Sequence, residues 1–419
     1  MENSKTKKLR VVNGNTMIVT IDIGKKIHYG YFRGTDGQDI KPFPFHNVKK
    51  SYEEFWMKAL QFKQQKNLEE IVVGFESTGP YAEPLMNFLS QKPVRLVQVN
   101  PMHTKRLKEL TGNSPNKTDC KDPRVIADVI ALGHALTVVV PEGSAAELRR
   151  LTQARQRASK NRNAMINQLH HLVFVIFPEF TQAIKMIASK SALYLLKNYP
   201  SPADIVELGL EDLQTHLRKI SLGRLKQCQI KSLFEAAGNT AGIDNGRKSL
   251  LIEIKHLACC IEQESEFIDH LEKQMRQYLK QIPYSQNILS IKGIGEVTLA
   301  GLIGEVGDFR QFKTIAEIMK LAGLDLYEIS SGKHQGQRHI SKRGRSHLRK
   351  LLFFAAINTI RTKGIMNGPY RKMIDKGMPK VKAVVAISRK LLRIIFAMVR
   401  NHTTYEENYA QQYYEKLAA

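Results

Sequence analysis

Acidic residues are scarce in this chain of 419 residues: 39 Asp and Glu stand against 64 Lys and Arg, which gives a formal net charge of +25. Cysteine is rarer still, and no Cys-x-x-Cys pair occurs, which excludes a disulfide framework and a cysteine-rich zinc site. The four cysteines are Cys120, Cys228, Cys259 and Cys260. No apolar run reaches transmembrane length, and residues 1–10 are polar and basic, so we expect neither a membrane anchor nor a signal peptide. These absences predict a protein of a reducing cytosol. The length of the chain is enough for two or three domains.

The surplus of positive charge is concentrated toward the C-terminal end. Residues 331–400 contain 18 basic residues and one acid, Asp375. Such a segment binds phosphate backbones with a strong salt dependence, which predicts a nucleic-acid partner. A basic surface on a ribosome-associated or membrane-adjacent protein is the alternative, and the acidic residues of the N-terminal region do not favour it.

Two short apolar segments each end in an acidic residue. Asp22 closes the segment 17–22, and Glu76 closes the segment 71–76; both are rich in β-branched residues and bounded by glycine, which predicts buried strands. A carboxylate at the end of a buried strand is costly unless a cation or hydrogen bonds compensate it. Taken together, the two acids suggest a metal site.

The segments around these strands predict a mixed sheet. Two further short strands precede a helix, and the second acid-bearing strand is followed by a helix, another strand and a helix that Pro101 opens. The added strands span 28–34, 41–47 and 94–99, with a turn at Asp36-Gly37, and the helices span 52–62 and a stretch that ends at Ser90. Three antiparallel strands followed by alternating helices and strands are typical of an RNase-H-like α/β fold.

Two more acids lie at the head of the next helix. Asp122 suits an N-cap and Pro123 the first position of a helix over 124–132, with Asp119 just before them. Four carboxylates can hold two Mg²⁺ ions, which together stabilise the attacking and leaving oxygens of a phosphoryl transfer. Asp128 is the fallback ligand on this helix, although it lies a turn or more deeper.

Each acid also has a simpler interpretation. Asp122 would serve as a helix cap alone, Asp119 as a solvated turn residue and Glu76 as a surface acid at a strand end. Each simple interpretation is about as plausible as the metal role for that residue by itself. Because all the acids coincide in one order of elements, we favour the metal site.

The middle of the chain is predicted to be helical. A capping box at Ser144 and Glu147 opens a helix that continues to about Phe177, before Pro178. One face of this helix is apolar, and its other faces are basic enough to contact nucleic acid, although solvated charge is the usual role of such a run. The apolar face consists of Leu148, Leu151, Ala158, Met165, Leu169, Leu172 and Ile176. The basic residues are Arg149, Arg150, Arg155, Arg157, Lys160 and Arg162.

A second stripe further along has coiled-coil spacing, interrupted by Glu264. It comprises Ile254, Leu257, Ile261, Ile268, Leu271, Met275 and Tyr278. We favour dimerisation through this stripe over an ordinary amphipathic helix packed inside the protein.

A third region begins near Tyr284. The segment Ile291-Lys-Gly-Ile-Gly295 lies between two apolar helical stretches, which resembles a helix-hairpin-helix whose turn offers backbone N–H groups to a phosphate. A capping box at Thr314 and Glu317 predicts a helix that ends at Gly323.

At this point the motifs add up to a specific resemblance. The chain resembles the DEDD transposases of insertion-sequence family 110, which are related to the pilin-gene invertases, over nearly its whole length. The motifs that carry the resemblance are the Asp22 strand, Phe75-Glu76-Ser-Thr-Gly, Asn116-Lys-Thr-Asp119-x-x-Asp122, Ile291-Lys-Gly-Ile-Gly, Ala322-Gly-Leu, Ser331-Gly, Ile340-Ser-Lys-Arg-Gly and the segment 384–392. Pro123 departs from the alanine that the family pattern has after the fourth acid.

The resemblance implies a Mg²⁺-dependent DNA recombinase that acts on donor and target DNA, is guided by an element-encoded RNA and works as a dimer or tetramer in the prokaryotic cytoplasm, at the nucleoid. It implies a RuvC-like domain (1–142), a coiled-coil insertion (143–283), a helical transposase domain (284–405) and a tail (406–419). The metal ligands would be Asp22, Glu76, Asp119 and Asp122. Nucleic-acid contacts are expected at Arg149, Arg150, Arg155, Arg157, Lys292, Gly293, Gly295, Lys333, Arg338, Lys342, Arg343, Arg345 and Arg349.

In the same resemblance, Ser331 attacks the DNA phosphate. Without it, Ser330 is an equal candidate, because Ser-Gly is a common turn. Among the neighbours of Ser331 in sequence, His334 and Lys333 are the basic groups, so the metal ions are the expected activator of its hydroxyl. A junction-resolvase-like nuclease that activates water, and a non-catalytic nucleic-acid-binding protein, are the alternative functions.

Overall fold

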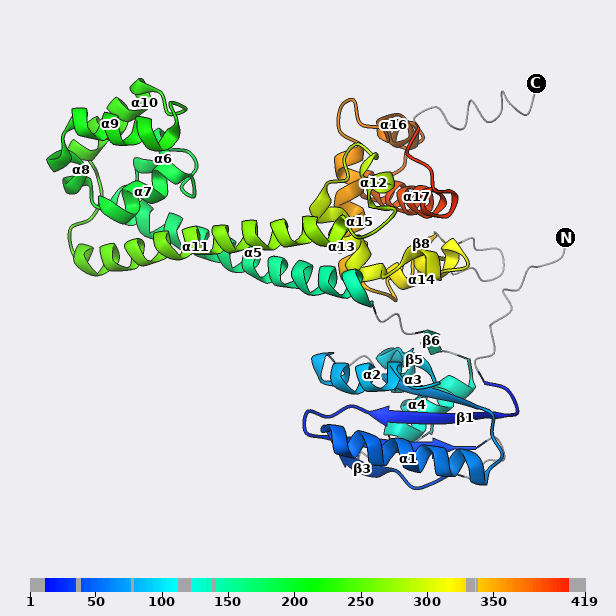
Figure 1. Ribbon diagram of the computed structural model, residues 1–419. Coiled ribbons are helices and arrows are strands. Elements are labelled where there is room, and N and C mark those ends of the chain that lie inside the picture. The colour runs from blue at the N-terminus through cyan, green and yellow to red at the C-terminus, as the bar shows by residue number, and fades with distance from the viewer. Residues whose placement is uncertain are drawn as a thin grey trace, which may run out of the picture. The chain divides into compact units, whose positions relative to one another are not determined.

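The computed structural model describes residues 12–34, 39–76, 79–111, 122–133, 135–137, 141–328, 336 and 338–406. The chain forms two compact units, Met1–Val140 and Pro141–Ala419 (Figure 1). Within the described ranges, no helix has the length and apolar character needed to cross a membrane.

The first unit is built on a six-stranded mixed sheet. Its strands are β1 (Thr16–Asp22), β2 (Ile27–Arg33), β3 (Phe43–His46), β4 (Glu70–Glu76), β5 (Arg95–Val99) and β6 (Ala135–Thr137). The order across the sheet is β3-β2-β1-β4-β5-β6. Strands β1, β2 and β3 are antiparallel, β4 runs parallel to β1 and to β5, and β6 closes the edge antiparallel to β5. The expected mixed sheet is confirmed; β6, only three residues long, was not predicted.

Helices cover both faces of this sheet. They are α1 (Lys49–Gln65), α2 (Glu83–Ser90) after a 3₁₀ turn (Gly79–Ala82), α3 (Pro101–Thr111) and α4 (Asp122–Ala131). Side chains alternate between the two faces of a strand, so β1 contributes to two cores. Val19 and Ile21 pack with Phe55 of α1 in one core, and Ile18 packs with Ile126 of α4 in the other. The sheet is therefore a middle layer between α1 and α4.

Gly74 lets α4 lie close against the sheet. A Cβ atom at this position of β4 would come within 2.1 Å of Ile130 Cδ1 on α4 and 3.2 Å of Val97 Cγ2 on β5. A larger residue at this point would require the Ile130 side chain to shift. The glycine thus lets α4, which begins at Asp122, pack closely against the sheet.

The second unit contains two long helices, α5 (Gly143–Ile176) and α11 (Arg247–Leu279), that run side by side (Figure 1). Polar contacts between them join Arg155 to Glu272 at 2.6 Å and Gln168 to Glu253 at 2.5 Å, so the two helices are antiparallel. The predicted capping box is wrong: α5 already begins at Gly143, and the Ser144 hydroxyl donates to Gln281 Oε1 at 2.6 Å.

The stripe on α11 that we expected to form a dimer is buried inside the chain. Ile254, Leu257 and Ile261 share one core with Leu169 and Leu172 of α5. Ile268, Leu271 and Met275, the next members of the stripe, are buried as well. Dimerisation through this stripe is therefore a wrong prediction, because intrachain packing already occupies the face.

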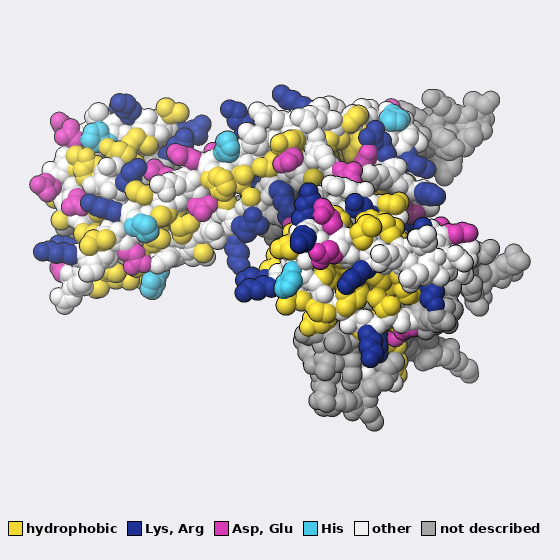
Figure 2. Space-filling view, turned by 60° about the horizontal axis from the view of Figure 1, so that its bottom comes forward, with side chains coloured by type: hydrophobic (Ala, Val, Ile, Leu, Met, Phe, Trp, Pro, Cys, Tyr) yellow, Lys and Arg dark blue, Asp and Glu magenta, His cyan; other side chains and the backbone are white. Residues whose placement is uncertain are grey.

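Five short helices cap the end of the paired helices and share the same core. They are α6 (Phe180–Ala183), α7 (Lys190–Asn198), α8 (Pro202–Leu208), α9 (Leu210–Ser221) and α10 (Gln227–Gly238). On the face seen in Figure 2, basic and acidic side chains are interspersed over this cap. The mixed surface contrasts with the composition of residues 331–400.

As far as the structure describes it, the rest of the second unit is helical apart from one short two-stranded ribbon. Its elements are α12 (Ser285–Leu289), α13 (Glu296–Val306), a 3₁₀ turn (Phe309–Gln311), α14 (Ile315–Ala322), β7 (Leu326–Tyr327), β8 (His339–Ile340), α15 (Ser346–Thr359), α16 (Asn367–Asp375) and α17 (Lys380–Asn401). Helix α14 ends at Gly323 as predicted, with φ of +63°. Its N-cap is Thr314, which makes no side-chain cap hydrogen bond; instead, Glu317 accepts a hydrogen bond from the Lys313 N–H at 3.2 Å.

The turn between α12 and α13 passes close to another part of the chain. Gly293 has φ of +107°, and a Cβ atom there would lie 3.0 Å from Thr359 Cγ2. Glycine suits this backbone conformation, and a larger residue would also have to displace Thr359 slightly. Gly295 then forms the N-cap of α13.

Candidate active site

Asp22 and Glu76 end two neighbouring parallel strands. In the register of β1 and β4, Ile21 lies opposite Phe75, so the two acids follow at the same edge of the sheet. The carboxyl ends of parallel strands are where α/β sheets usually bind ligands. The sheet therefore positions both predicted residues for a shared site.

Asp122 reaches the same edge from α4. It is the first residue of this helix, and Thr20 of β1 donates its hydroxyl to the Pro123 carbonyl at 2.6 Å in a buried hydrogen bond. Thr20 has no exposed surface, so the bond ties the start of α4 to β1 two residues before Asp22. Pro123 takes part through its carbonyl oxygen, which any residue offers, so the departure from the family pattern leaves this anchor intact.

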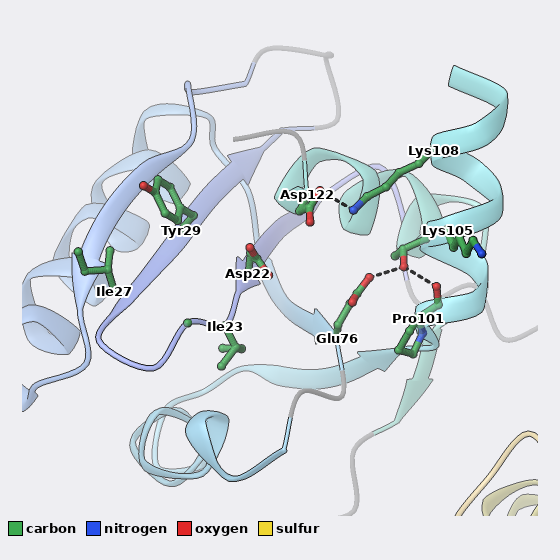
Figure 3. Close-up of a pocket in the computed structure, with 11 residues that line it drawn as sticks. Asp22, Ile23, Ile27, Tyr29, Glu76, Pro101, Lys105, Lys108 and Asp122 are labelled. Carbon is green, nitrogen blue, oxygen red and sulfur yellow. Dashed lines mark hydrogen bonds and ion pairs between the residues drawn. The ribbon is translucent and has the colours of Figure 1, made fainter. Parts of the chain in front are cut away.

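The three acids line one cavity of about 480 Å³ (Figure 3). Its other lining residues are Ile23, Gly24, Ile27, Tyr29, Pro101, Thr104, Lys105 and Lys108. The structure thus brings Asp22, Glu76 and Asp122 together, as the sequence predicted. Asp119, the fourth predicted acid, lies outside the described residues.

Helix α3 forms one wall of the cavity, and the sequence reasoning missed its role. Pro101, Thr104, Lys105 and Lys108 recur at the spacing of a single helix face. The Thr104 hydroxyl donates to Glu76 Oε1, and Lys108 Nζ lies 2.5 Å from Asp122 Oδ1 (Figure 3). The signal was present: Thr104, Lys105 and Lys108 are polar residues on one face of a helix that follows a strand paired with the Glu76 strand.

A buried histidine supports the loop that follows Asp22. The Gly24 N–H donates to His28 Nδ1 at 3.2 Å, and a Cβ atom on Gly24 would lie 2.0 Å from the Ile27 carbonyl oxygen. Burial lowers the pKa of His28, which favours the neutral ring that can accept this hydrogen bond. The loop at the cavity is therefore held by local packing as well as by the sheet.

The chemical type of the donor atoms in the cavity suits a hard cation. Asp22, Glu76 and Asp122 offer carboxylate oxygens, which Mg²⁺ prefers, and all three face one cavity. Among the described residues, however, no three acids, histidines or cysteines already lie close enough together to hold an ion. Asp122 is engaged by Lys108, so a cation that binds there must replace an ammonium group.

Asp128, the fallback ligand, lies elsewhere. Its Oδ1 pairs with Arg33 Nη1 at 2.6 Å, and the residue is not among those that line the cavity. Arg33 also donates from Nε to the Tyr31 hydroxyl at 3.1 Å. Asp128 thus takes part in a polar group that joins α4 to β2, and of the two acids on α4 it is Asp122 that lines the cavity.

The predicted nucleic-acid contacts fall into three groups. The exposed residues are Arg150, Arg157, Lys292, Gly293, Gly295, Arg338, Lys342 and Arg343, of which Arg338 pairs with Glu328 at 2.9 Å. The partly buried residues are Arg149, Arg155, Arg345 and Arg349. Arg155 pairs with Glu272 at 2.6 Å, and Arg349 donates to the Ala322 carbonyl at 2.9 Å. Lys333 and Ser331 lie outside the described residues.

Arg149 and Arg345 belong to a buried group centred on Glu305. His347 Nδ1 lies 3.1 Å from Glu305 Oε1, and Arg345 Nη1 lies 3.9 Å from Oε2 and donates to the Glu305 carbonyl. Burial alone would raise the pKa of Glu305, but His347, Arg149 and Arg345 outweigh it and lower this pKa. Burial, reinforced by Arg149, lowers the pKa of Arg345 to about 10.

Comparison with known proteins adds two matches to family models. A transposase model of the DEDD, IS110 type matches residues 19–178, and the model described as transposase IS116/IS110/IS902 family matches residues 285–371. The first match includes Asp22, Glu76 and Asp122, and the two together span more than half of the chain. The chain belongs to the IS110 family of transposases. The resemblance seen in the sequence is confirmed, and the protein is a transposase or recombinase enzyme of that family.

Individual relatives agree with this assignment. An uncharacterised protein of insertion element IS110 from Streptomyces coelicolor is 24% identical over 92% of this transposase and 94% of its own length. An uncharacterised protein of IS116 from Streptomyces clavuligerus is 24% identical over 91% and 94%. A pilin gene-inverting protein of Moraxella lacunata is 29% identical over 37% of this chain and 48% of its own length.

Proposed function

We propose that this IS110-family transposase is a Mg²⁺-dependent DNA recombinase, guided by an element-encoded RNA, that cleaves and exchanges strands of donor and target DNA through a phosphoserine intermediate. One observation carries the proposal: acids from β1, β4 and α4, separated by up to a hundred residues of sequence, line a single cavity. The protein would act in the cytoplasm, at the nucleoid, as a dimer or tetramer.

The order of strands supports an RNase-H-like, RuvC-like fold for the first unit. Three antiparallel strands lie beside two strands parallel to β1, and the acids sit at the ends of β1 and β4. The antiparallel helices α5 and α11 support a coiled-coil insertion over 143–283. The glycine turn between α12 and α13 supports a helix-hairpin-helix at the start of a transposase domain over 284–405.

The acids would hold the metal, with Asp119 as the fourth member of the tetrad. Bound Mg²⁺ supplies a Lewis acid that stabilises charge on the attacking and leaving oxygens. The protein's own part is to hold the carboxylates in place: the sheet fixes Asp22 and Glu76, the Thr104 hydroxyl orients Glu76, and the Thr20 to Pro123 hydrogen bond fixes the head of α4.

The serine step is a transesterification. Ser331 Oγ forms a bond to phosphorus as its hydroxyl proton is removed, and the bond from phosphorus to one deoxyribose oxygen breaks; that oxygen leaves as a protonated hydroxyl. A hydroxyl of the exchanging strand then attacks phosphorus and releases the serine. The number of phosphoester bonds is conserved, so exchange needs no external energy source. The similarity to pilin gene-inverting proteins favours such rejoining over simple hydrolysis, because inversion of a DNA segment requires its strands to be rejoined.

The test is to trap the covalent adduct. Denaturing electrophoresis of labelled DNA after incubation with the protein, its RNA and Mg²⁺ should show a protein–DNA adduct for the wild type and for Ser330→Ala, and none for Ser331→Ala. Asp22→Asn should also form no adduct. If Ser331→Ala cleaves DNA at the wild-type rate, water is the nucleophile and the protein is a junction-resolvase-like nuclease.

A further inference from the structure

Lys108 lines the cavity and forms an ion pair with one of its three acids. Its Nζ lies 2.5 Å from Asp122 Oδ1; the lysine side chain is 36% exposed and that of Asp122 18% exposed. Figure 3 shows the lysine extending from α3 to Asp122 at the head of α4. One proposed metal ligand is thus already paired with a positive charge.

Lys105 lies one turn earlier on the same helix and lines the same cavity. Its side chain is exposed, and among the described residues it makes no ion pair. The two lysines therefore share a helix, a charge and a cavity, and differ in that only Lys108 holds a carboxylate. This difference makes Lys105 a matched control.

An ammonium group and a divalent cation cannot occupy the same side of Asp122, because they repel each other at short range. A lysine also has no lone pair to offer a metal while it is protonated. The ion pair is partly exposed, and such pairs are weak and easily exchanged. The long, flexible side chain lets the ammonium withdraw into solvent when a cation takes its place.

We infer that Lys108 is a displaceable counter-charge of the metal site, which neutralises Asp122 until Mg²⁺ replaces it. This rests on the proposed function, because it requires the three acids to bind Mg²⁺. Lys108 thereby lowers the apparent affinity for the metal. It is a positioning residue, since it acts on the metal through Asp122.

The test measures Mg²⁺ affinity on the full chain without DNA, by isothermal titration calorimetry. Lys108→Gln should bind Mg²⁺ about five- to tenfold more tightly than the wild type. The variant lacks the ammonium group, partly screened by solvent, that competes with Mg²⁺ for Asp122. Lys105→Gln should stay within about twofold of the wild type, and Lys108→Arg, which keeps the charge, should bind no more tightly than the wild type.

Thermal unfolding gives a second readout that does not depend on activity. Without the Lys108 ammonium group, the carboxylates that line the cavity repel one another more strongly. Mg²⁺ should therefore raise the Tm of Lys108→Gln more than that of the wild type. Equal Mg²⁺ affinity and equal Tm rise in Lys108→Gln and Lys105→Gln would overturn the inference, as would weaker Mg²⁺ binding by Lys108→Gln.

The proposed function can fail separately. If Asp22→Asn abolishes Mg²⁺ binding but Lys108→Gln leaves it unchanged, the metal site stands and only the role of Lys108 is lost. If the wild type and Asp22→Asn bind Mg²⁺ equally poorly, the metal site itself falls and the inference falls with it.

Discussion

Carboxylates meet basic side chains in both units, but the surroundings differ. In the first unit, Asp122 faces a cavity and pairs with the partly exposed Lys108. In the second unit, Glu305 is only 6% exposed and is enclosed by Arg345 and His347. The buried acid is engaged by neighbouring side chains inside the fold, whereas the cavity gathers three acids on a surface that an ion can reach. The first arrangement suits a ligand, and the second stabilises the fold.

The largest effect is expected from substituting the acids that line the cavity. Asp22→Asn or Glu76→Gln keeps the side-chain shape but removes a charge needed for the metal, so recombination should fall by at least about a thousandfold. Recombination of an element-bearing plasmid in cells measures the loss, and circular dichroism and RNA binding should remain near those of the wild type. Activity like that of the wild type in either variant would remove the acids from the mechanism.

Glu305 should show the opposite pattern, a loss of stability. Glu305→Ala leaves the guanidinium of Arg345 buried without its carboxylate and should lower the free energy of unfolding by about 3 kcal/mol. Denaturant titration of the full chain measures this loss. Mg²⁺ affinity should not change, and a change in affinity without a loss of stability would contradict the structural role.

The same residue gives a prediction about pH. Its folded pKa is lowered from the ordinary value of 4.5, so its contribution to stability is present above that value and is lost as the pH falls toward the folded pKa. Denaturant titrations from pH 6 down to about pH 3 should therefore show a steeper decline for the wild type than for Glu305→Gln. Parallel curves would show that the pKa of Glu305 is not lowered in the folded protein.

The two units also differ in how far the sequence predicts them. Two short apolar runs, each closed by an acid, are enough to predict that Asp22 and Glu76 end neighbouring buried strands, because this pattern is local in the sequence. The wall formed by α3 was missed, because the contact of Lys108 with Asp122 joins two different helices. Its helical spacing predicts a face but not the partner of that face.

In the second unit the same local patterns were ambiguous. A stripe such as Ile254 to Met275 has the same spacing whether its partner is a second copy or another helix of the same chain. The partner proved to be α5, which lies about a hundred residues earlier in the sequence. Likewise, Arg345 and Lys342 look alike in a basic run, yet one is drawn into the Glu305 group and the other is exposed.

That last contrast can be tested directly. Replacing Lys342 and Arg343 together by alanine should weaken DNA binding and reduce the slope of log K against log salt by about 2, since two fewer phosphates are neutralised. Arg345→Ala should instead lower stability, because its side chain is mostly buried beside Glu305. Fluorescence anisotropy at several salt concentrations measures the slope. An unchanged slope in the double variant would place the DNA elsewhere.

The smallest expected effect concerns Asp128, and it sharpens the distinction between the two acids of α4. Asp128 pairs with Arg33 at 2.6 Å in a partly exposed position, so Asp128→Asn should cost less than about 1 kcal/mol of stability. Asp122→Asn, on the same helix, should instead abolish recombination, because this residue faces the cavity with Asp22 and Glu76. Denaturant titration and plasmid recombination of the two variants distinguish an acid that only forms an ion pair, Asp128, from one that binds the metal, Asp122. If Asp128→Asn loses activity as completely as Asp122→Asn while its stability is intact, the helix contributes a ligand from its deeper turn, and the head of α4 is not the metal-binding end.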